Sequence, residues 1–472
     1  MIHSVEKAKE IVRRVFHAYS GSLAVRFWNG ETVELGAGSP RATVIFRAPG
    51  PFRELALFRD PLRFAEAYFH GLVDVEGNLF SVLEQKEHLQ SLSFSAPESF
   101  SLLAAALLLG NGLDERGNPP VEVRRSKEWP VRPSRKHSQA ADRKAIAFHY
   151  DVSNDFYGLW LDGQMVYSCA YFENADDSLD EAQRNKLDYL CRKLRLRQSE
   201  RLLDIGCGWG ALICWAAKHY GVQAHGITLS RNQYEYARTK IREQGLEKQV
   251  TVELRDYRNV AGEAVYDKIV SVGMFEHVGL KNLPLYFRTA HRLLKPDGLF
   301  LNHGITHDEE GWRKSHATTF INRYVFPDGE LDTASNVQRV MERSQFEILD
   351  VEALRPHYAL TLRHWVSRLE QRREKALQYV DEATYRIWRL YMTACALEFE
   401  SGGAGVYQIL ASRRQPGAAA VALTRRDLYD RPCGQPRSDA FRPPTKSGGT
   451  PYSYPESTVL QIHNLSGIRH GT

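Results

Sequence analysis

Short apolar runs alternate with helically spaced apolar residues through the middle of the chain. Runs at 202–205, 222–227, 250–254, 268–272 and 299–301 predict strands, and the segment 211–220, stopped by Gly221, predicts a helix. This alternation predicts a mostly parallel sheet covered by helices on both faces. In sheets of this kind the ligand lies at the carboxyl ends of the strands.

Two more helices are predicted between these strands. Ser230 suits an N-cap, and Gln233, three residues later, is the partner that a capping box requires. The next helix is predicted to end at the turn 295–298, and its apolar stripe consists of Leu283, Tyr286, Phe287, Ala290 and Leu294.

The segments on either side of this region have other patterns. Residues 5–19 place apolar side chains on one helical face and basic ones on the other, which favours a helix over a core, with a lipid surface as the alternative. Residues 23–46 are strand-like and 62–109 predict several helices, so a small α+β domain is expected over 1–110. Residues 311–411 predict a mainly helical, aromatic lid or wall over the ligand edge of the sheet.

The stretch 202–210, Leu-Leu-Asp-Ile-Gly-Cys-Gly-Trp-Gly, carries the strongest functional signal. Gly206, Gly208 and Gly210 predict a tight strand-to-helix turn that lets a ligand approach the backbone. Their spacing fits neither the dinucleotide fingerprint nor a phosphate-binding loop. Asp204 suits the ammonium of S-adenosylmethionine, a zwitterion without phosphate. A structural corner with packing glycines is the alternative.

Length and charge suggest how the chain is divided. Its 472 residues are long for one domain, and 43% hydrophobic residues suffice for a large core. The net charge is +5, and residues 124–144 hold eight basic residues and only two acids. We expect a basic linker over 111–145, a catalytic domain over 146–412 and a disordered tail over 413–472.

The basic linker has three interpretations. It is either a solvated connection or a segment attracted to an anionic membrane surface, at about 1 kcal/mol for each basic residue near the headgroups. Nucleic acid would attract it too, but no nucleic-acid-binding module accompanies it, so no nucleic-acid partner is expected.

The cysteines and the N-terminus favour a reducing compartment. No apolar leader segment begins the chain, and its most apolar run, 102–109, is far shorter than the about 20 residues that span a bilayer. We therefore expect a cytoplasmic protein, soluble or peripheral at the inner membrane surface. The six cysteines lack paired spacing: Cys169, Cys191, Cys207, Cys214, Cys395 and Cys433.

Seven motifs, in order between about 148 and 412, resemble the cyclopropane-fatty-acyl-phospholipid synthase family of S-adenosylmethionine-dependent enzymes. The resemblance implies an α/β fold with a seven-stranded, mostly parallel methyltransferase sheet and a helical lid. Residues 67–71 resemble, less specifically, the extra N-terminal domain of longer members. This resemblance implies that the N-terminal domain of the chain holds the phospholipid and supports a homodimer. The motifs are 149–151 (His-Tyr-Asp), 167–171 (Tyr-Ser-Cys-Ala-Tyr), 204–210, 228–230 (Thr-Leu-Ser), 274–279 (Met-Phe-Glu-His-Val-Gly), 326–329 (Phe-Pro-Asp-Gly) and 357–358 (His-Tyr).

The resemblance also implies the contacts of the cofactor. Many related methyltransferases bind ribose with an acid after the second strand. Here Thr228 stands in that region, so hydroxyl groups and Gln233 must replace it, whether or not Ser230 and Gln233 also cap a helix. The implied cofactor residues, besides Asp204, are Tyr167, Ser168, Gly206, Cys207, Gly208, Thr228, Leu229, Ser230, Arg231, Asn232, Gln233, Asp256 and Tyr257.

In the family, bicarbonate is the base that completes the reaction. The resemblance assigns its site to Cys169, Glu276, His303 and Tyr358, with the backbone of Ile305, and no metal is expected. Hydroxyl, imidazole and thiol groups can bond a small oxyanion, whereas Glu276 must accept its O–H or be protonated itself.

Two cysteines and one departure qualify this assignment. Cys395 matches a family cysteine assigned to the active site, although a cysteine in an apolar helix more often packs in a core, and the same alternative applies to Cys169. Asn302 stands where an aliphatic residue is expected before His303, which puts substrate detail in question.

The leading interpretation is methylene transfer from S-adenosylmethionine to a cis double bond of an unsaturated phospholipid, giving a cyclopropane. One alternative is a methyltransferase that leaves a methyl branch or acts on a small amine. The other is a membrane-binding protein that retains the cofactor site without catalysis, which loss of Glu276, His303 or Tyr358 would favour; all three are present.

Overall fold

The computed structural model describes residues 2–17, 19–58, 60–109, 137–150, 152–313, 315–416 and 421–429. Most of the predicted linker and tail, and Cys433, lie outside these residues. Two units are distinguished, 1–424 and 425–472; the described part of the second contains α18 (Arg426–Tyr429). The last residues of the predicted linker belong to α7 (Gln139–Tyr150).

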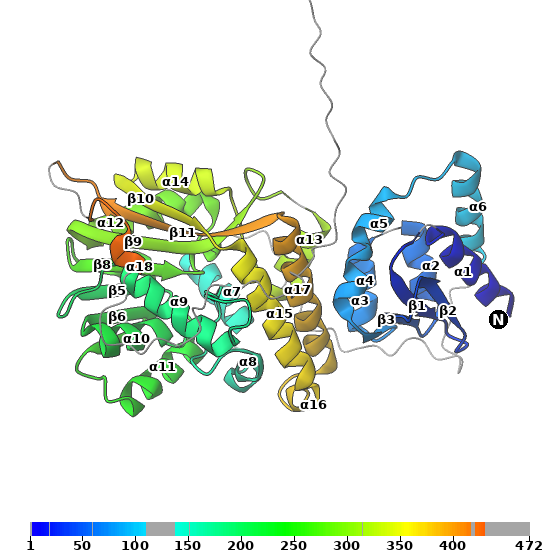
Figure 1. The fold of residues 1–472 in the computed structure, drawn as a ribbon, viewed down its shortest axis with the longest axis horizontal. Helices are drawn as coiled ribbons and strands as arrows, with labels where there is room; N and C mark the ends of the chain where they lie inside the picture. Colours follow the sequence, from blue (N-terminus) through cyan, green and yellow to red (C-terminus); the bar gives the residue numbers. More distant parts are fainter. Residues whose placement is uncertain are drawn as a thin grey trace, which may run out of the picture. The chain divides into compact units, whose positions relative to one another are not determined.

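A seven-stranded sheet forms the centre of the larger unit, in the order β10-β11-β9-β8-β5-β6-β7 (Figure 1). Strands β9, β8, β5, β6 and β7 are parallel, while β11 runs antiparallel to both of its neighbours. This confirms the predicted seven-stranded, mostly parallel α/β sheet. Its strands are β5 (Arg201–Ile205), β6 (Gln223–Thr228), β7 (Val250–Leu254), β8 (Tyr266–Val272), β9 (Leu294–His307), β10 (Phe346–Ala353) and β11 (Ala404–Arg413).

Helices pack on both faces of this sheet through separate apolar clusters. On one face lie α9 (Leu179–Lys193), α10 (Ala211–Tyr220) and α11 (Arg231–Glu243). On the other lie α12 (Leu283–Leu293) and α14 (Ala334–Arg343). Burial of branched and aromatic side chains against both faces, at about 25 cal/mol per Å² of apolar area, supplies most of the stabilisation.

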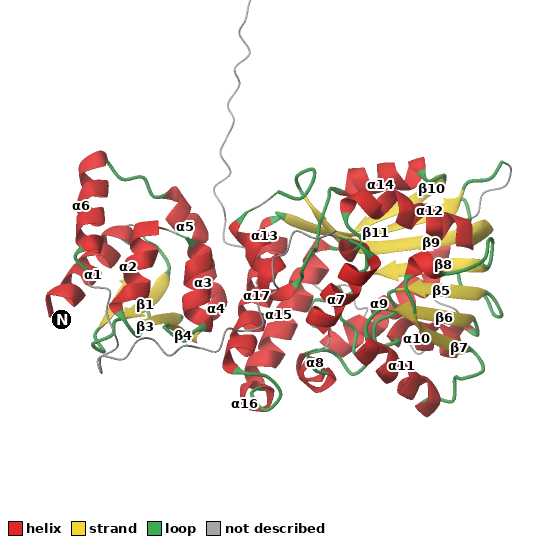
Figure 2. Cartoon of the chain, turned by 180° about the vertical axis from the view of Figure 1, so that it is seen from behind, coloured by secondary structure: helices red, strands yellow, loops and turns green. Residues whose placement is uncertain are grey.

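A third apolar cluster joins the remaining helices to the carboxyl edge of the sheet. Its core is α15 (Arg355–Gln371) packed against α17 (Glu382–Ser401) (Figure 2). This pair supplies the predicted helical wall. The shorter segments are α8 (Asn154–Trp160), α13 (His316–Phe320), α16 (Arg373–Ala376), the 3₁₀ turns η1 (Tyr257–Asn259), η2 (Phe275–His277) and η3 (Leu280–Asn282), and the π-helical η4 (Ile321–Val325).

The N-terminal α+β module has a four-stranded sheet of its own, in the order β2-β1-β3-β4. The guanidinium of Arg386 on α17 donates to the carbonyl oxygens of Tyr68 and Val73, which ties this module to the helical pair. Its elements are α1 (Ile2–Val15), β1 (Ser22–Arg26), β2 (Thr32–Gly36), β3 (Ala42–Phe46), α2 (Pro49–Phe58), α3 (Pro61–Phe69), β4 (Val73–Gly77), α4 (Leu79–Leu83), α5 (Gln85–Ser91) and α6 (Ala96–Leu107).

Three local predictions were wrong. Strand β4 lies in a segment predicted to be helical, and β10 and β11 lie in the predicted lid, because both regions owe their extended form to pairing with distant strands. The turn 295–298 is a bulge inside β9 instead of a connection: Leu294 and Leu299 face Tyr266 and Lys268, with Asp297 at φ 59°.

Candidate active site

The glycine turn after β5 forms the floor of a pocket. Gly206, Gly208 and Gly210 have φ of 89°, 54° and 83°, a conformation that glycine adopts without strain. The N–H groups of Gly206 and Cys207 both donate to the carbonyl of Ile227, which ties the turn to β6. A Cβ on Gly206 would lie 2.8 Å from Met274 Cγ, so the glycine is required sterically as well.

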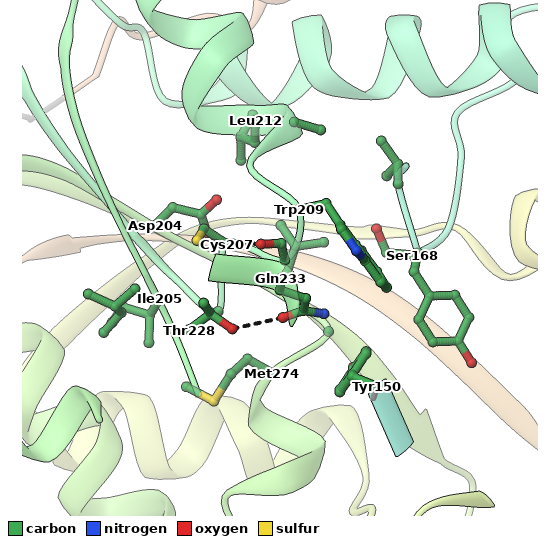
Figure 3. A pocket seen from close by; sticks show the side chains of 18 of the residues that line it. Tyr150, Ser168, Asp204, Ile205, Cys207, Trp209, Leu212, Thr228, Gln233 and Met274 are labelled. Carbon is green, nitrogen blue, oxygen red and sulfur yellow. Dashed lines mark hydrogen bonds between the residues drawn. The ribbon is translucent and has the colours of Figure 1, made fainter. Parts of the chain in front are cut away.

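The pocket above this turn encloses about 930 Å³, including space open to solvent (Figure 3). Trp209 forms part of its wall; its indole N–H donates to Asn154 Oδ1 at 2.8 Å, which fixes the ring. Ten predicted cofactor residues line it: Tyr167, Ser168, Asp204, Gly206, Cys207, Gly208, Thr228, Leu229, Gln233 and Tyr257.

The other four predicted cofactor residues lie outside the lining. Ser230 is buried and caps α11, accepting the N–H of Gln233, while Arg231 is exposed and pairs with Glu235. Asn232 is half-buried on the same helix. Asp256 is buried and accepts from the Arg258 guanidinium, so that carboxylate is already engaged.

The cap of α11 differs from the predicted capping box. Gln233 does not return a bond to the Ser230 N–H; its Oε1 accepts the Thr228 hydroxyl at 2.7 Å, inside the pocket (Figure 3). The Ser230 N–H donates instead to Thr228 Oγ1. Thr228 thus accepts the Ser230 N–H that Gln233 would accept in a capping box. The amide nitrogen of Gln233 can therefore donate to a ligand.

Several buried polar groups in the pocket are suited to the predicted cofactor. Asp204 is 2% exposed, and its Oδ1 has no hydrogen-bond partner within the described chain. Burial raises the pKa of this carboxyl to about 7, opposed by the Lys186 ammonium. The Tyr257 hydroxyl is likewise buried without a partner among the described residues. A ligand with an ammonium and hydroxyl groups would satisfy both, so S-adenosylmethionine fits these residues.

A second polar site is built around Glu276 in η2. Its Oε1 accepts the N–H of Ile305 at 2.7 Å, and its Oε2 is buried with no partner in the described part of the chain. Burial raises the pKa of this carboxyl to about 7, although the Ile305 bond lowers it. The predicted backbone donor of Ile305 is therefore engaged by Glu276.

His303 on β9 lies two residues before Ile305, whose N–H donates to Glu276. Gln408 Nε2 and His303 Nδ1 are 3.2 Å apart, whereas His303 Nε2 is buried and unbonded among the described atoms. Burial lowers the pKa of this imidazole well below its usual value, and Lys186 and Lys193 lower it further. His303 is therefore neutral and can accept or donate one further bond.

Asn302 and His303 point to opposite faces of β9, because side chains alternate along a strand. The Oδ1 of Asn302 accepts the hydroxyl of Tyr286 on α12 at 3.3 Å. The carboxyl of Glu276 lies on the same face, since a Cβ on Gly304 would be 3.2 Å from Glu276 Oε1. The departure from the family pattern thus lies on the Glu276 side of the strand, where Glu276 adds to the effect of burial in raising the pKa of Tyr286.

The hydroxyl of Tyr358 lies near Cys169, Glu276 and Cys395. Burial raises the pKa of the Tyr358 hydroxyl well above its usual value, and the nearby Cys169, Glu276 and Cys395 raise it further. Burial also raises the pKa of the Cys169 thiol, and that of Cys395 to about 12. Both cysteines are therefore neutral thiols, not thiolate nucleophiles, and the Cys169 thiol already donates to the carbonyl oxygens of Ala170 and Leu354.

Aromatic rings connect the two sites. Trp365 lies with its ring 5.2 Å from that of Tyr167, which lines the cofactor pocket, and 6.0 Å from that of Tyr358. Buried π faces attract a cation and exclude water. An apolar, aromatic wall therefore joins the cofactor pocket to Tyr358.

Sequence reasoning missed several groups at these sites. Lys186 and Met274 line the cofactor pocket, and Gln408 contacts His303. Lys186 is in phase with the apolar residues Leu179, Ala182 and Leu190 of its helix, and this spacing could have identified it as buried. Gln408 gave no such signal, because its partner lies 105 residues away.

The described residues contain no cluster of three or more His, Cys, Asp or Glu residues suited to a metal ion. Within the same ranges, no helix has the length and apolar character needed to cross a bilayer.

Comparison with known families yields two matches. The family model described as mycolic acid cyclopropane synthetase matches residues 137–409, and a domain of unknown function matches 9–96. The first match contains both sites, and the second lies within the N-terminal module.

Individual relatives agree with the first match. A probable fatty acid methyltransferase of Pseudomonas putida is 39% identical over 410 residues, 86% of this chain and 96% of the relative. Cyclopropane-fatty-acyl-phospholipid synthase of Escherichia coli K12 is 38% identical over 276 residues, 58% of this chain and 69% of the relative. The structure of mycolic acid cyclopropane synthase CmaA1 complexed with SAH and CTAB superposes with a TM-score of 0.54 at 34% identity, covering 57% of this chain and 98% of that one.

Proposed function

Because the chain belongs to the mycolic acid cyclopropane synthetase family of S-adenosylmethionine-dependent methyltransferases, we propose that it forms cyclopropane rings on lipids. The reaction transfers a methylene group from S-adenosylmethionine to a cis double bond of an unsaturated phospholipid acyl chain. S-adenosylhomocysteine and a proton are the other products. The observation that supports this most directly is that Glu276 Oε2 and His303 Nε2 are both buried without a partner among the described residues.

The cofactor supplies an electrophilic methyl group on a sulfonium, and the chain supplies geometry, dryness and a route for the proton. An alkene is a weak nucleophile, so the pocket must hold it in line and exclude water. The wall of Trp365, Tyr167 and Tyr358 provides an apolar surface whose π faces steady positive charge.

We assign proton removal to a bicarbonate, which Glu276 and His303 would hold. The carboxylate of Glu276 would accept the O–H of this anion, and a neutral His303 would donate to one of its oxygens. The hydroxyl of Tyr358, which lies near Glu276, would be a further donor. Loss of a proton from the transferred methyl group would then close the ring, so that no cation is left for water to capture.

A second candidate is methyl-branch formation. The Pseudomonas putida relative, described as a probable fatty acid methyltransferase, supports it, and the two reactions differ only in which proton leaves. Methylation of a small amine has less support, because an amine needs neither an apolar aromatic wall nor a bound base.

Product analysis distinguishes these reactions. Purified enzyme is incubated with S-adenosylmethionine carrying a labelled methyl group and vesicles of unsaturated phospholipid, and the lipids are examined by mass spectrometry and NMR. We expect a mass gain of one CH₂ group with loss of the olefinic protons and appearance of cyclopropane protons. Retained olefinic protons beside a new methyl or methylene branch would select the second candidate, and unmodified lipid would refute both.

A phospholipid substrate requires contact with a bilayer, which we assign to α6. Leu102, Ala105 and Ala106 face the core of the N-terminal module, while Phe100, Leu103 and Leu107 are exposed by 73%, 46% and 55%. Three large apolar side chains at helical spacing are typical of an interfacial helix.

The charges beside this stripe favour anionic lipid over a second protein. Helix α1 packs along α6, and its Arg13 and Arg14 are exposed. Arg14 donates to Ser101 of α6 and also pairs with Glu10. The chain continues from α6 toward the basic residues 124–144, so positive charge accompanies the apolar stripe on both sides in sequence.

A further inference from the structure

Lys186 on α9 is a buried cation in the wall of the cofactor pocket. It is 2% exposed, and its Nζ donates to Ser168 Oγ at 2.9 Å. No carboxylate in the described chain lies within 4.0 Å of this ammonium. An ammonium has three donors, so one neutral hydroxyl leaves it poorly compensated.

The other buried lysines of the described chain either form ion pairs or lie outside the pocket lining. Lys9 pairs with Glu6 and Glu31, and Lys240 donates to the carbonyl of Gln164 outside the pocket lining. Lys193, on the same helix, forms ion pairs with Glu352 and Asp350. Lys268 on β8 lies 3.8 Å from Glu200 and does not line the cofactor pocket. Lys186 differs because it combines burial, a pocket-lining position and the lack of an ion pair among the described residues.

The charge opposite Lys186 in the same pocket is Asp204, itself incompletely bonded. Burial lowers the pKa of Lys186 to about 8, opposed by Asp162 and Asp204, and raises that of Asp204 to about 7. Arg255 also lines the pocket, but it is exposed and pairs with Glu253. A buried cation and a buried anion in one pocket match an α-amino acid, which carries a carboxylate and an ammonium on one carbon.

We propose that Lys186 binds the α-carboxylate at the methionine end of the cofactor, while Asp204 binds the adjacent ammonium. Ser168 takes part in the same contact: since Lys186 donates to its oxygen, the Ser168 hydroxyl hydrogen is directed away from Lys186 and is free to donate to the carboxylate. The proposal rests on the cofactor assignment but not on the lipid product, so either can fail alone.

Ligand binding tests this role without turnover. S-adenosylhomocysteine and 5′-methylthioadenosine share the adenosine and the thioether, but only the first carries the amino-acid group. Titration calorimetry on Lys186→Met should show affinity for S-adenosylhomocysteine reduced by about 10- to 100-fold, the range for a hydrogen bond between charged groups. Affinity for 5′-methylthioadenosine should change by less than about threefold.

The matched control is Lys268→Met, which removes a similarly buried ammonium outside the pocket and should leave both affinities unchanged. Equal losses for the two ligands in Lys186→Met would show a merely structural lysine and overturn the proposal, as would no loss for either.

A second arm covers the case in which Lys186→Met does not fold. Wild-type protein should bind the carboxamide of S-adenosylhomocysteine, which lacks the carboxylate charge, about 10-fold or more weakly than S-adenosylhomocysteine. Equal affinity for the two would overturn the proposal without any variant.

Discussion

Replacing Glu276 with glutamine removes the carboxylate proposed to accept the O–H of the bicarbonate, while keeping the shape of the polar site. The amide oxygen of Glu276→Gln can still accept the Ile305 N–H, which Glu276 Oε1 accepts at 2.7 Å. We therefore expect the free energy of unfolding to change by less than about 1.5 kcal/mol. Glu276 does not line the cofactor pocket, so the dissociation constant of S-adenosylhomocysteine should also stay the same.

Turnover should respond far more strongly. General acid–base catalysis contributes roughly 10²- to 10⁴-fold, so kcat of the variant should fall by that factor, or roughly 3–5 kcal/mol in the barrier. Because the pKa of the Glu276 carboxyl is raised to about 7 and the carboxylate is the acting form, wild-type kcat/KM should rise with pH through about 7. The variant should lack this rise.

The assay is the formation of labelled lipid at several pH values, with calorimetric titration of S-adenosylhomocysteine on the same preparations. Glu342→Gln, at an exposed position of α14, is the matched control and should behave as wild type. Turnover of Glu276→Gln above about one-tenth of wild type, with an unchanged pH profile, would refute the assignment of Glu276 to proton transfer.

Three further predictions concern stability and membrane binding. The ring nitrogens of His137 lie 3.6 Å from carboxylate oxygens of Asp142 and Glu330, and its pKa is raised from 6.5 to about 9. The free energy of unfolding of the wild type should therefore fall by up to about 3 kcal/mol as pH rises from about 6.5 to 9. Urea denaturation of His137→Gln should show no such loss, and an equal loss would exclude His137 as its source. Gly226→Ala places a Cβ 2.8 Å from Cys207 Sγ, so it should lower the free energy of unfolding by about 1–3 kcal/mol and weaken binding of S-adenosylhomocysteine. The control is Gly50→Ala, whose Cβ meets nothing within 4 Å and which should be neutral or slightly stabilising. Similar thermal melts for the two variants would contradict this prediction. A triple variant with serine in place of Phe100, Leu103 and Leu107 should cosediment with anionic vesicles roughly tenfold or more less than wild type. Undiminished binding would show that α6 does not contact the membrane. The control is Leu285→Ser, at an exposed position of α12.

Local sequence patterns correctly predicted the part of the fold around the cofactor pocket. Helix 211–220 and strand 250–254 have the boundaries predicted for them, because a glycine stop and a short branched run determine those segments locally. The cofactor residues of the glycine turn were identified for the same reason, since the positive φ of Gly206, Gly208 and Gly210 follows from the turn itself.

The rest depends on contacts between distant segments. Strands β10 and β11 pair antiparallel at the end of the sheet, and each follows helical segments in the chain. The spacing of their apolar residues therefore did not distinguish them from the helices before them. The sixth and seventh strands were expected from the family resemblance instead of from the residues. Lys186 was missed because a lysine on a helix with many charged residues is normally solvated, and only the fold places it against Ser168.

The attachment of the polar site to β9 has a consequence for how substrate range can diverge. Glu276 is anchored to Ile305, and the N–H of Gly273 donates to the carbonyl of His303, so the acid, the imidazole and the end of β8 form one rigid frame. Trp365 and Tyr358 belong to α15, outside the sheet. A change of substrate range can therefore arise at Trp365, in the aromatic wall, while the hydrogen bonds that join Glu276, β8 and β9 are preserved.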